Sequence, residues 1–222
     1  MKVSVVIPTM NEEQSIGSVL DDVNRTMSGS KYDYEVLIVD TNSMDRTREI
    51  ALSKGAKVVE EPRRGYGRAY KSGFEAAIGE VIATLDADCT YPAEDIPQLC
   101  DMLLQEELDF ITTDRFARME EGAMSGMHRF GNKLLTTTSR LLFSVKFKDS
   151  QSGMWIIRKS ALGTLNVEDD GMPFSEEIKI EAFRNVRARE VPIVYRKRVG
   201  EVKLSSWKDG WKNFKFLWKK RF

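Results

Sequence analysis

Two aspartates, Asp86 and Asp88, are the residues of this sequence best placed to do chemistry. They follow an apolar run at residues 81–85, which has the composition of a buried strand. Two carboxylates in a tight turn offer hard oxygen ligands, which suit Mg²⁺ or Mn²⁺ shared with the phosphates of a substrate. A solvated acidic turn is the simpler explanation for an isolated pair, but the position after an apolar strand favours a cation site.

Polar residues also follow the first two apolar runs of the chain. Asp40 comes directly after the run at residues 35–39, where a carboxylate can accept hydrogen bonds from a ribose or a base. Asp45 precedes a helical pattern, so we assign it to helix capping. A helix that begins at such an edge also favours a diphosphate. The positions after the first run, residues 3–7, are Pro8, Thr9, Asn11 and Glu12, which are candidates for nucleotide contacts.

Short apolar runs alternate with amphipathic stretches along the chain. The spacing predicts strands at residues 3–7, 35–39, 57–59, 81–85, 109–113, 154–158 and 188–195. It predicts helices at residues 11–23, 46–54, 68–78, 93–106, 129–143 and 174–185. This alternation indicates an α/β fold with a parallel sheet wrapped by helices, in which ligands bind beyond the carboxyl ends of the strands. We expect one domain over residues 1–204 and an amphipathic tail over residues 205–222.

The composition fits one globular domain and limits the possible functions. The 222 residues are 41% hydrophobic, with 34 basic and 34 acidic side chains. No apolar run approaches the roughly 18 residues that a membrane span requires. Cys89 and Cys100 form neither a metal-binding nor a disulfide pattern, so we expect a reducing, cytoplasmic environment. The single histidine, His128, excludes metal sites built from several histidines.

The end of the chain combines positive charge with aromatic side chains. Residues 203–222 hold seven Lys or Arg against Asp209 alone, and the remainder of the chain is acidic, which argues against nucleic-acid binding. A terminal helix packed on the core is one explanation, and Gly210 weakens the helix prediction. We favour peripheral binding to the cytoplasmic face of a membrane, where such helices place aromatic rings at the interface and lysines against anionic lipids. The aromatic residues at helical spacing are Trp207, Trp211, Phe214, Trp218 and Phe222.

Six segments carry a resemblance to a known family. They are VVIPTMNEE at residues 5–13, VDTNSMDRT at 39–47, RRGYGRAYKSGFEAA at 63–77, LDADCTYP at 85–92, DSQSGMW at 149–155 and EVPIVYRKRVGEVKL at 190–204. In this order they resemble the family 2 glycosyltransferases of GT-A type, and among them the dolichyl-phosphate mannose synthase-like branch. The resemblance implies a Rossmann-like, mostly parallel sheet and metal-dependent transfer of one sugar from a UDP- or GDP-linked donor to a polyprenyl phosphate.

The resemblance also implies roles for individual residues. The nucleotide contacts are matched by Pro8, Thr9, Glu12 and Asp40. The acidic pair that meets ribose, metal and diphosphate is matched by Asp86 and Asp88, and the cationic clamp on the donor phosphates by Arg198 and Lys203. Arg115 matches a basic residue near the phosphates, and Glu177 matches a helical carboxylate on the acceptor side.

The sequence departs from the family's pattern at several positions. Thr41 and Asn42 replace an acidic residue and a glycine after Asp40, which bears on base recognition. Thr90 stands where glutamine is common, which leaves a third metal ligand open. Val202 precedes Lys203 where serine is frequent. Residues 124–129 do not match the Arg/Ser pair of the mannose synthases, so the resemblance does not imply mannose specificity.

Histidine is the commonest general base in enzymes, and this chain has only His128. The reaction should therefore be one that needs no histidine base. A phosphate monoester is already ionised near neutral pH and attacks without a general base, whereas an alcohol acceptor needs one. We therefore predict direct, inverting displacement at the anomeric carbon, with Asp88 holding the metal and Arg198 and Lys203 stabilising the leaving group. Arg115 or Arg129 would hold the lipid phosphate. Positioning and charge stabilisation would provide most of the acceleration.

Three alternative functions stay open at the level of the sequence. A glycosyltransferase that acts on a sugar hydroxyl would use Glu177 as its base. A sugar-nucleotide nucleotidyltransferase would use the Gly-rich basic loop at residues 63–68, although that loop does not follow the first strand. A non-catalytic, membrane-associated partner subunit would leave the acidic pair without an explanation.

Overall fold

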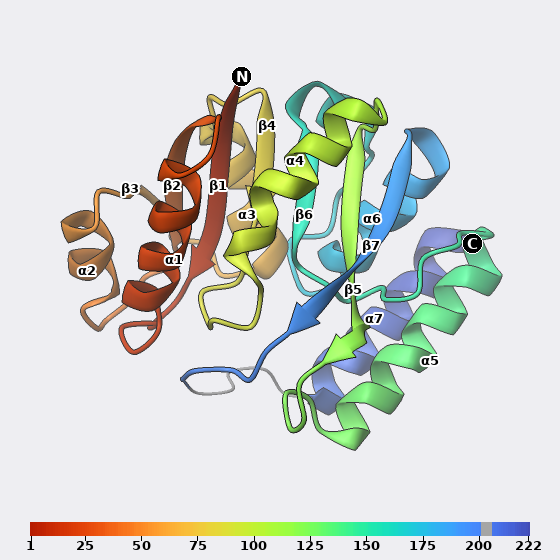
Figure 1. Cartoon of the computed structure of the whole chain (residues 1–222). Helices are drawn as coiled ribbons and strands as arrows, with labels where there is room; N and C mark the ends of the chain where they lie inside the picture. The colour runs from red at the N-terminus through yellow and green to blue at the C-terminus, as the bar shows by residue number, and fades with distance from the viewer. Residues whose placement is uncertain (201–205) are drawn as a thin grey trace.

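The computed structural model describes residues 1–200 and 206–222, with the side chains of the last helix described from Gly210 onward. Figure 1 shows how its elements are arranged. The strands are β1 (Lys2–Thr9), β2 (Asp33–Asp40), β3 (Lys57–Glu60), β4 (Val81–Thr84), β5 (Phe110–Met119), β6 (Trp155–Arg158) and β7 (Ala188–Tyr195). The helices are α1 (Ile16–Ser28), α2 (Thr47–Ser53), α3 (Tyr66–Ala76), α4 (Ile96–Gln105), α5 (Gly126–Phe143), α6 (Phe174–Asn185) and α7 (Ser206–Arg221), with short 3-10 turns η1 (Ala93–Asp95) and η2 (Lys159–Thr164).

The strands form a seven-stranded sheet in the order β3-β2-β1-β4-β6-β5-β7. β1 is parallel to β2 and β4, β2 is parallel to β3, and β5 is parallel to β7. β6 runs antiparallel to both of its neighbours, β4 and β5. The predicted α/β fold with a mostly parallel sheet is confirmed, and one strand of that sheet is reversed.

Helices cover both faces of the sheet, with α1 and α4 in front of it in Figure 1 and α3 and α6 behind it. The two side-chain directions of β1 show why. Val3, Val5 and Ile7 join a core cluster with α1 and α4, whereas Val6 joins a second cluster with α3 and α6. The residues of α1 that are buried follow the predicted spacing: Ile16, Val19, Leu20, Val23 and Met27.

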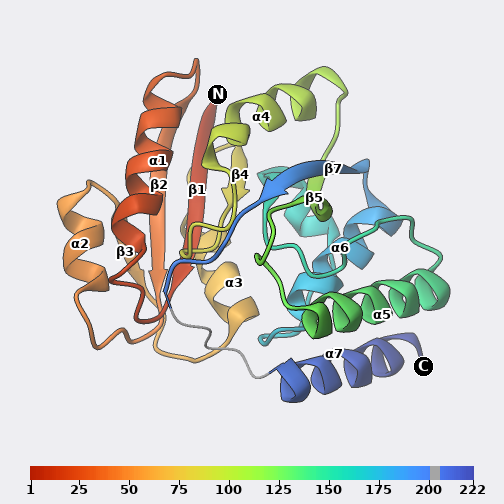
Figure 2. The same cartoon turned by 60° about the horizontal axis from the view of Figure 1, so that its bottom comes forward.

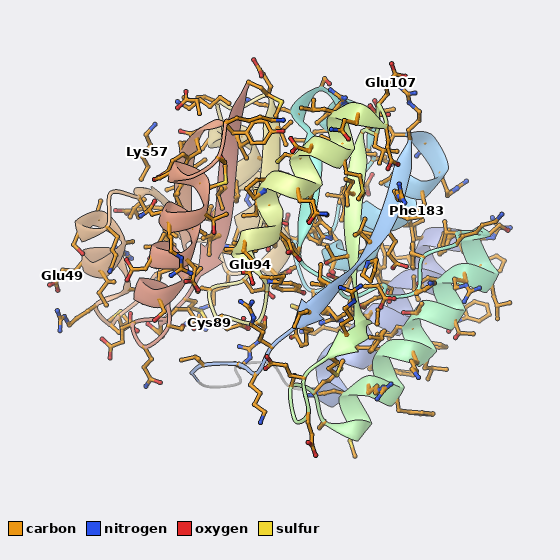
Figure 3. The ribbon with its side chains drawn as sticks, in the orientation of Figure 1. Glu49, Lys57, Cys89, Glu94, Glu107 and Phe183 are labelled. Carbon is orange, nitrogen blue, oxygen red and sulfur yellow. The ribbon has the colours of Figure 1, made fainter. Side chains whose placement is uncertain are left out.

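The carboxyl ends of β1, β2 and β4 meet at one edge of the sheet, because the three strands are parallel. Thr9 at the end of β1 is in register with Asp40 at the end of β2. Thr84 at the end of β4 is in register with Val6. Figure 3 places Cys89, which follows β4, near this edge and Glu107 at the opposite one. The polar residues that follow these three strands therefore lie in one region.

The last helix packs on the body of the protein and lies alongside α5 (Figure 2). Leu217 and Asn213 of α7 are buried. Leu217 belongs to a small core cluster with residues of α5 and α6, including Leu135 and Ile180. Trp211, by contrast, is 59% exposed. The predicted helix is present. One side of it packs on the core, which was one of the two explanations that the sequence allowed for the tail.

The helices described in residues 1–200 and 206–222 are all too short or too polar to cross a membrane.

Candidate active site

Asp86 and Asp88 lie at the rim of a large cavity at the carboxyl edge of the sheet. The cavity has a volume of about 1430 Å³. All four residues of β4 are buried, so the strand fixes the position of the turn that follows it. Among the predicted site residues, those that line the cavity are Pro8, Thr9, Glu12, Asp86, Asp88, Glu177 and Arg198.

Asp86 is partly buried beside the hydroxyl groups of two tyrosines. The hydroxyls of Tyr66 and Tyr70 each lie 3.4 Å from its Oδ1 atom. Burial, together with the charge of Asp88, raises the pKa of Asp86 to about 7. A nearby cation would favour the ionised form of this carboxyl, so the environment fits a cation-binding role.

Asp88 is held rigidly and is paired with an arginine. Its Oδ1 atom accepts hydrogen bonds from the backbone N–H and the hydroxyl of Thr90, at 3.1 and 2.6 Å. Nη2 of Arg198 lies 2.6 Å from its Oδ2 atom. The backbone N–H of Val199 donates to the carbonyl of Asp88 at 2.9 Å, and this bond brings the segment after β7 to the acidic pair. Thr90 therefore orients Asp88, and it does so from the position at which glutamine is common in the resembled family.

The donor set fits a divalent cation that is shared with a ligand. Within residues 1–200 and the described part of α7, no three His, Cys, Asp or Glu side chains gather closely enough to bind a metal ion. Asp86 and Asp88 would therefore supply the protein ligands, and phosphate oxygens and water the others. Mg²⁺ and Mn²⁺ are commonly bound in this way, through one or two carboxylates and the phosphates of a substrate.

The tips of β1 and β2 are tied together by hydrogen bonds. Asp40 accepts from the hydroxyl of Thr9 at 3.2 Å, and Nε of Arg48 lies 2.5 Å from its Oδ2 atom. Asn11, with a φ of 57°, accepts from the backbone N–H of Met44 at 2.7 Å. Asp40 and Asn11 do not line the cavity, whereas Thr41 does. The geometry gives Asp40 and Asn11 a part in shaping the two tips.

Arg115 and Arg129 lie outside the lining of the cavity. The guanidinium of Arg115 is buried and forms a bidentate ion pair with Asp149, at 2.6 and 2.9 Å. Arg129 is exposed on α5. Lys203 lies outside the described residues, so its predicted contact with the donor phosphates stays a prediction.

Glu177 lines the cavity and has several partners within the protein. Its Oε2 atom accepts from the backbone N–H groups of Glu168 and Asp169, at 3.0 and 2.8 Å. Its Oε1 atom lies 2.9 Å from Nζ of Lys220 on α7. The carboxylate thus connects α6 to the segment before it and to the last helix.

Two parts of the cavity wall were not predicted from the sequence. The segment at residues 166–173 lacks any apolar period, and α7 was expected to be separate from the core. A signal for the first is the Gly-rich loop, because a Cβ atom on Gly67 would lie 2.6 Å from the carbonyl of Asp169. The backbone N–H of Arg68 donates to the carbonyl of Asp170 at 3.0 Å. The glycine of this loop therefore allows close packing on the segment 166–173.

The fold is of the GT-A type seen in glucosyl-3-phosphoglycerate synthase from Mycobacterium tuberculosis. One of its crystal structures, in complex with UDP, aligns with a TM-score of 0.79 and 20% identity over 99% of this chain and 79% of that one. Other structures of the synthase hold UDP together with Mn²⁺ or with Mg²⁺. At this level of identity the likeness is one of fold.

Sequence comparison defines the family. The "Low-salt glycan biosynthesis hexosyltransferase Agl6" of Haloferax volcanii is 36% identical over 217 residues, which cover 96% of this chain and 52% of that protein. The "Dolichyl-phosphate hexose transferase" of the same organism is 38% identical over 209 residues, which cover 93% of this chain and 88% of that protein. The chain thus spans about half the length of the first relative and most of the second.

Residues 4–165 match the family described as Glycosyl transferase family 2, and the chain belongs to this family. The class predicted from the sequence, a glycosyltransferase, is confirmed. A "Dolichol-phosphate mannosyltransferase" of Pyrococcus furiosus is a more distant relative, 28% identical over 92% of this chain.

Proposed function

We propose that this protein transfers a single hexose, with inversion, from a UDP- or GDP-linked donor to a polyprenyl phosphate. The observation that carries the proposal is the contact between Asp88 and Arg198 at the edge of a cavity that also contains Thr9 and Glu12. Two carboxylates that would hold a cation lie there beside an arginine that would bind a diphosphate. The printed name of the 38% identical Haloferax protein supports the dolichyl-type acceptor.

The residues near the acidic pair would bind the nucleotide sugar and stabilise the nucleoside diphosphate as it leaves. Thr9 and Glu12 would contact the nucleotide, with Asp40 and Asn11 holding their strand tips in place. Asp86 and Asp88 would hold Mg²⁺ or Mn²⁺, which supplies positive charge against the departing diphosphate. Arg198 would bind the same phosphates, and Lys203 would contribute a second cation.

The acceptor would act as its own nucleophile. A phosphate monoester carries negative charge near neutral pH, so its oxygen can attack the anomeric carbon without losing a proton to the protein. The bond from that carbon to the diphosphate breaks as the new bond forms, and the nucleoside diphosphate leaves with the electron pair. The sequence predicts Arg115 or Arg129 as the partner of this phosphate, and neither residue lines the cavity.

A membrane surface would deliver the lipid acceptor. α7 exposes Trp211 and Trp218, Phe222 directly after it is also exposed, and the neighbouring α5 exposes Phe130 and Leu141. Figure 2 shows the two helices side by side at one edge of the molecule. Apolar and aromatic side chains on paired amphipathic helices suit the interfacial layer of a bilayer. The protein would therefore act at the cytoplasmic face, bound peripherally.

A transfer assay tests the proposal directly. Purified protein is incubated with UDP- and GDP-hexoses and a short polyprenyl phosphate, with Mn²⁺ or with EDTA, and the glycolipid is measured. We expect transfer that requires both the metal and the acceptor's phosphate group. Equal transfer to the matching polyprenol, or full activity in EDTA, would contradict the proposal.

Glu177 distinguishes a phosphate acceptor from a sugar hydroxyl. A hydroxyl acceptor needs a base, and Glu177 is the helical carboxylate that would serve. Its hydrogen bonds to residues 168–169 and its ion pair with Lys220 favour a role in holding the cavity wall. Glu177→Gln should therefore lower transfer by less than about tenfold, since general-base removal typically costs 10²–10⁴. Complete loss in a folded variant would favour the hydroxyl acceptor.

A further inference from the structure

One side of α7 is basic and faces the cavity. Lys212, Lys215 and Lys219 follow one another at positions i, i+3 and i+7, and all three line the cavity. They extend over about 10 Å of the helix, from the rise of about 1.5 Å per residue. The exposed aromatic side chains Trp211 and Trp218 precede two of these lysines by one residue and lie on the adjacent side.

The orientation of this basic side is fixed by packing on the opposite side of the helix. Leu217 is fully buried. The side-chain amide of Asn213 donates to Oε1 of Gln151 at 3.1 Å. Lys220 lies 2.9 Å from Glu177 and 3.1 Å from Glu181. These contacts fix the rotation of the helix about its own axis. Because of this orientation, the three lysines form part of the cavity wall.

The carboxylates of the same cavity are largely occupied by other cations. Glu177 and Glu181 share Lys220, and Asp170 lies 2.9 Å from Nζ of Lys71. Lys215 lies with its Nζ 5.5 Å from the centre of the Trp211 ring. Among the described residues, no carboxylate lies within 4.0 Å of Lys215 or Lys219. Positive charge at Lys215 and Lys219 thus remains on this wall for an anionic ligand.

We infer that Lys212, Lys215 and Lys219 bind the phosphate monoester of the lipid acceptor, an inference that rests on the proposed function. The donor diphosphate has its own cation, Arg198, at the acidic pair. Arg115 is committed to Asp149 and does not line the cavity. The lysine wall offers the phosphate a cationic surface within the same cavity. The first of these lysines, Lys212, directly follows Trp211, whose side of the helix would meet the membrane. A lipid would therefore pass from the bilayer to the site along one helix.

Lysine side chains suit an acceptor phosphate that must move along the cavity wall. An ammonium on a flexible chain acts as a point charge and can follow a phosphate that moves along a cavity. Three such groups in a row would keep the phosphate bound while its lipid tail stays outside. Removal of one exposed lysine should weaken binding by about two- to fivefold, because exposed pairs each contribute modestly.

The test measures binding of a ten-carbon prenyl phosphate in solution, without vesicles, so that membrane attachment plays no part. Single Lys→Gln variants and the triple variant of Lys212, Lys215 and Lys219 are compared with Arg221→Gln. Arg221 belongs to the same helix and does not line the cavity. We expect the triple variant to lose tenfold or more in affinity for the prenyl phosphate, with binding of UDP or GDP unchanged, and Arg221→Gln to bind as the wild type.

Three results separate the possible failures. If the triple variant binds prenyl phosphate as tightly as the wild type, the lysine assignment is overturned while the proposed function stands. If the wild type binds the prenyl phosphate no better than the uncharged prenol, the phosphate acceptor itself is refuted, and the lysine assignment with it. Competition by inorganic phosphate at equal concentration would assign the wall to a soluble phosphate and overturn the lipid assignment.

Discussion

The two halves of this molecule are built differently. From β1 to α4, strands and helices alternate, each strand is parallel to its neighbours in that half, and polar side chains follow the strand tips. From β5 to α7, one strand is reversed and two helices lie side by side at the edge of the molecule (Figure 2). The first half fixes its site residues through the sheet, and the second fixes them through helix packing.

This difference has a consequence for stability. Asp86 and Asp88 follow a strand whose residues are all buried in the main core. The lysines of α7 depend on a smaller cluster that contains Leu217 and five other buried side chains. Regions with fewer buried contacts open more easily than the core. Changes at the acidic pair should therefore alter the chemistry, and changes that loosen α7 should alter capture of the acceptor.

The largest effect is expected at the acidic pair. Asp88→Asn keeps the shape of the side chain but removes the charge that pairs with Arg198 and that would hold the proposed metal ion. Transfer should fall by about 10³-fold, the loss typical when a group that stabilises charge in the transition state is removed. The measurement is kcat for sugar transfer at saturating Mn²⁺, with folding checked by thermal unfolding.

Asp33→Asn is the matched control for this change. Asp33 begins β2 at the opposite edge of the sheet, where its side chain is 72% exposed and pairs with Lys2. Transfer by this variant should equal that of the wild type. A folded Asp88→Asn enzyme with similar kcat would show that the strand tip does not carry the chemistry.

The next effect concerns the arginine that reaches the acidic pair from the end of β7. Arg198→Gln should lower kcat/KM for the donor by about 10²-fold, since it would remove the proposed charge-assisted contact to the leaving diphosphate. Arg196→Gln is the control, because Arg196 pairs with Glu94 on η1 and does not line the cavity. Equal losses in both variants would contradict a specific role for Arg198.

A smaller and more selective effect should follow from loosening α7. Leu217→Ala leaves a cavity in a small cluster, at a cost of about 2–5 kcal/mol to the packing of the helix. We expect kcat/KM for the polyprenyl phosphate to fall by about tenfold, while binding of the nucleotide is unchanged. Leu52→Ala, at a position on α2 that is 60% exposed, is the control. Equal loss of nucleotide binding would show that the halves are not independent.

The smallest effect is on the pH dependence of stability. Burial raises the pKa of Glu176 well above its usual range, and Gln151 donates to its Oε2 atom at 3.1 Å. The folded state therefore holds this proton while the unfolded chain releases it, so wild-type stability should fall as pH rises above the ordinary carboxyl range. Glu176→Gln removes this decline.

We expect Glu176→Gln to melt a few degrees above the wild type at pH 8, with a smaller difference at pH 5. Glu75→Gln, at an exposed position on α3, should show the same melting temperature as the wild type at both values. A constant difference between Glu176→Gln and wild type across this range would mean that the buried carboxyl is ionised in the folded protein.

Individual helices and strands could be predicted from the sequence in both halves, because their signals are local. The spacing of apolar residues placed α6 and β7 at their observed bounds, Phe174–Asn185 and Ala188–Tyr195. The length of β5 was underestimated, because a register shift between Asp114 and Arg118 lets the strand continue beyond residue 113 to Met119. The reversal of β6 was not predicted, since alternation along a chain carries no information about strand direction.

The donor end of the cavity could be predicted better than its other end. Asp86, Asp88 and Thr9 line the cavity as expected, because they follow parallel strands whose tips must meet. The segment 166–173 and α7 line it through long-range packing, which no local pattern encodes. The buried position of Leu217 depends on packing against α5 and α6, which precede it in the chain by many residues.

The reversal of β6 gives this enzyme an unusual constraint on insertions. A loop that follows a parallel strand can lengthen without disturbing what lies before it. Here Gly153, just before β6, lies against Asp86, and a Cβ atom there would lie 3.2 Å from the carboxylate and would clash with the hydroxyl of Tyr66. Asp149, four positions earlier, is anchored to Arg115. An insertion within residues 149–153 should therefore disturb both Asp86 and the Arg115–Asp149 ion pair.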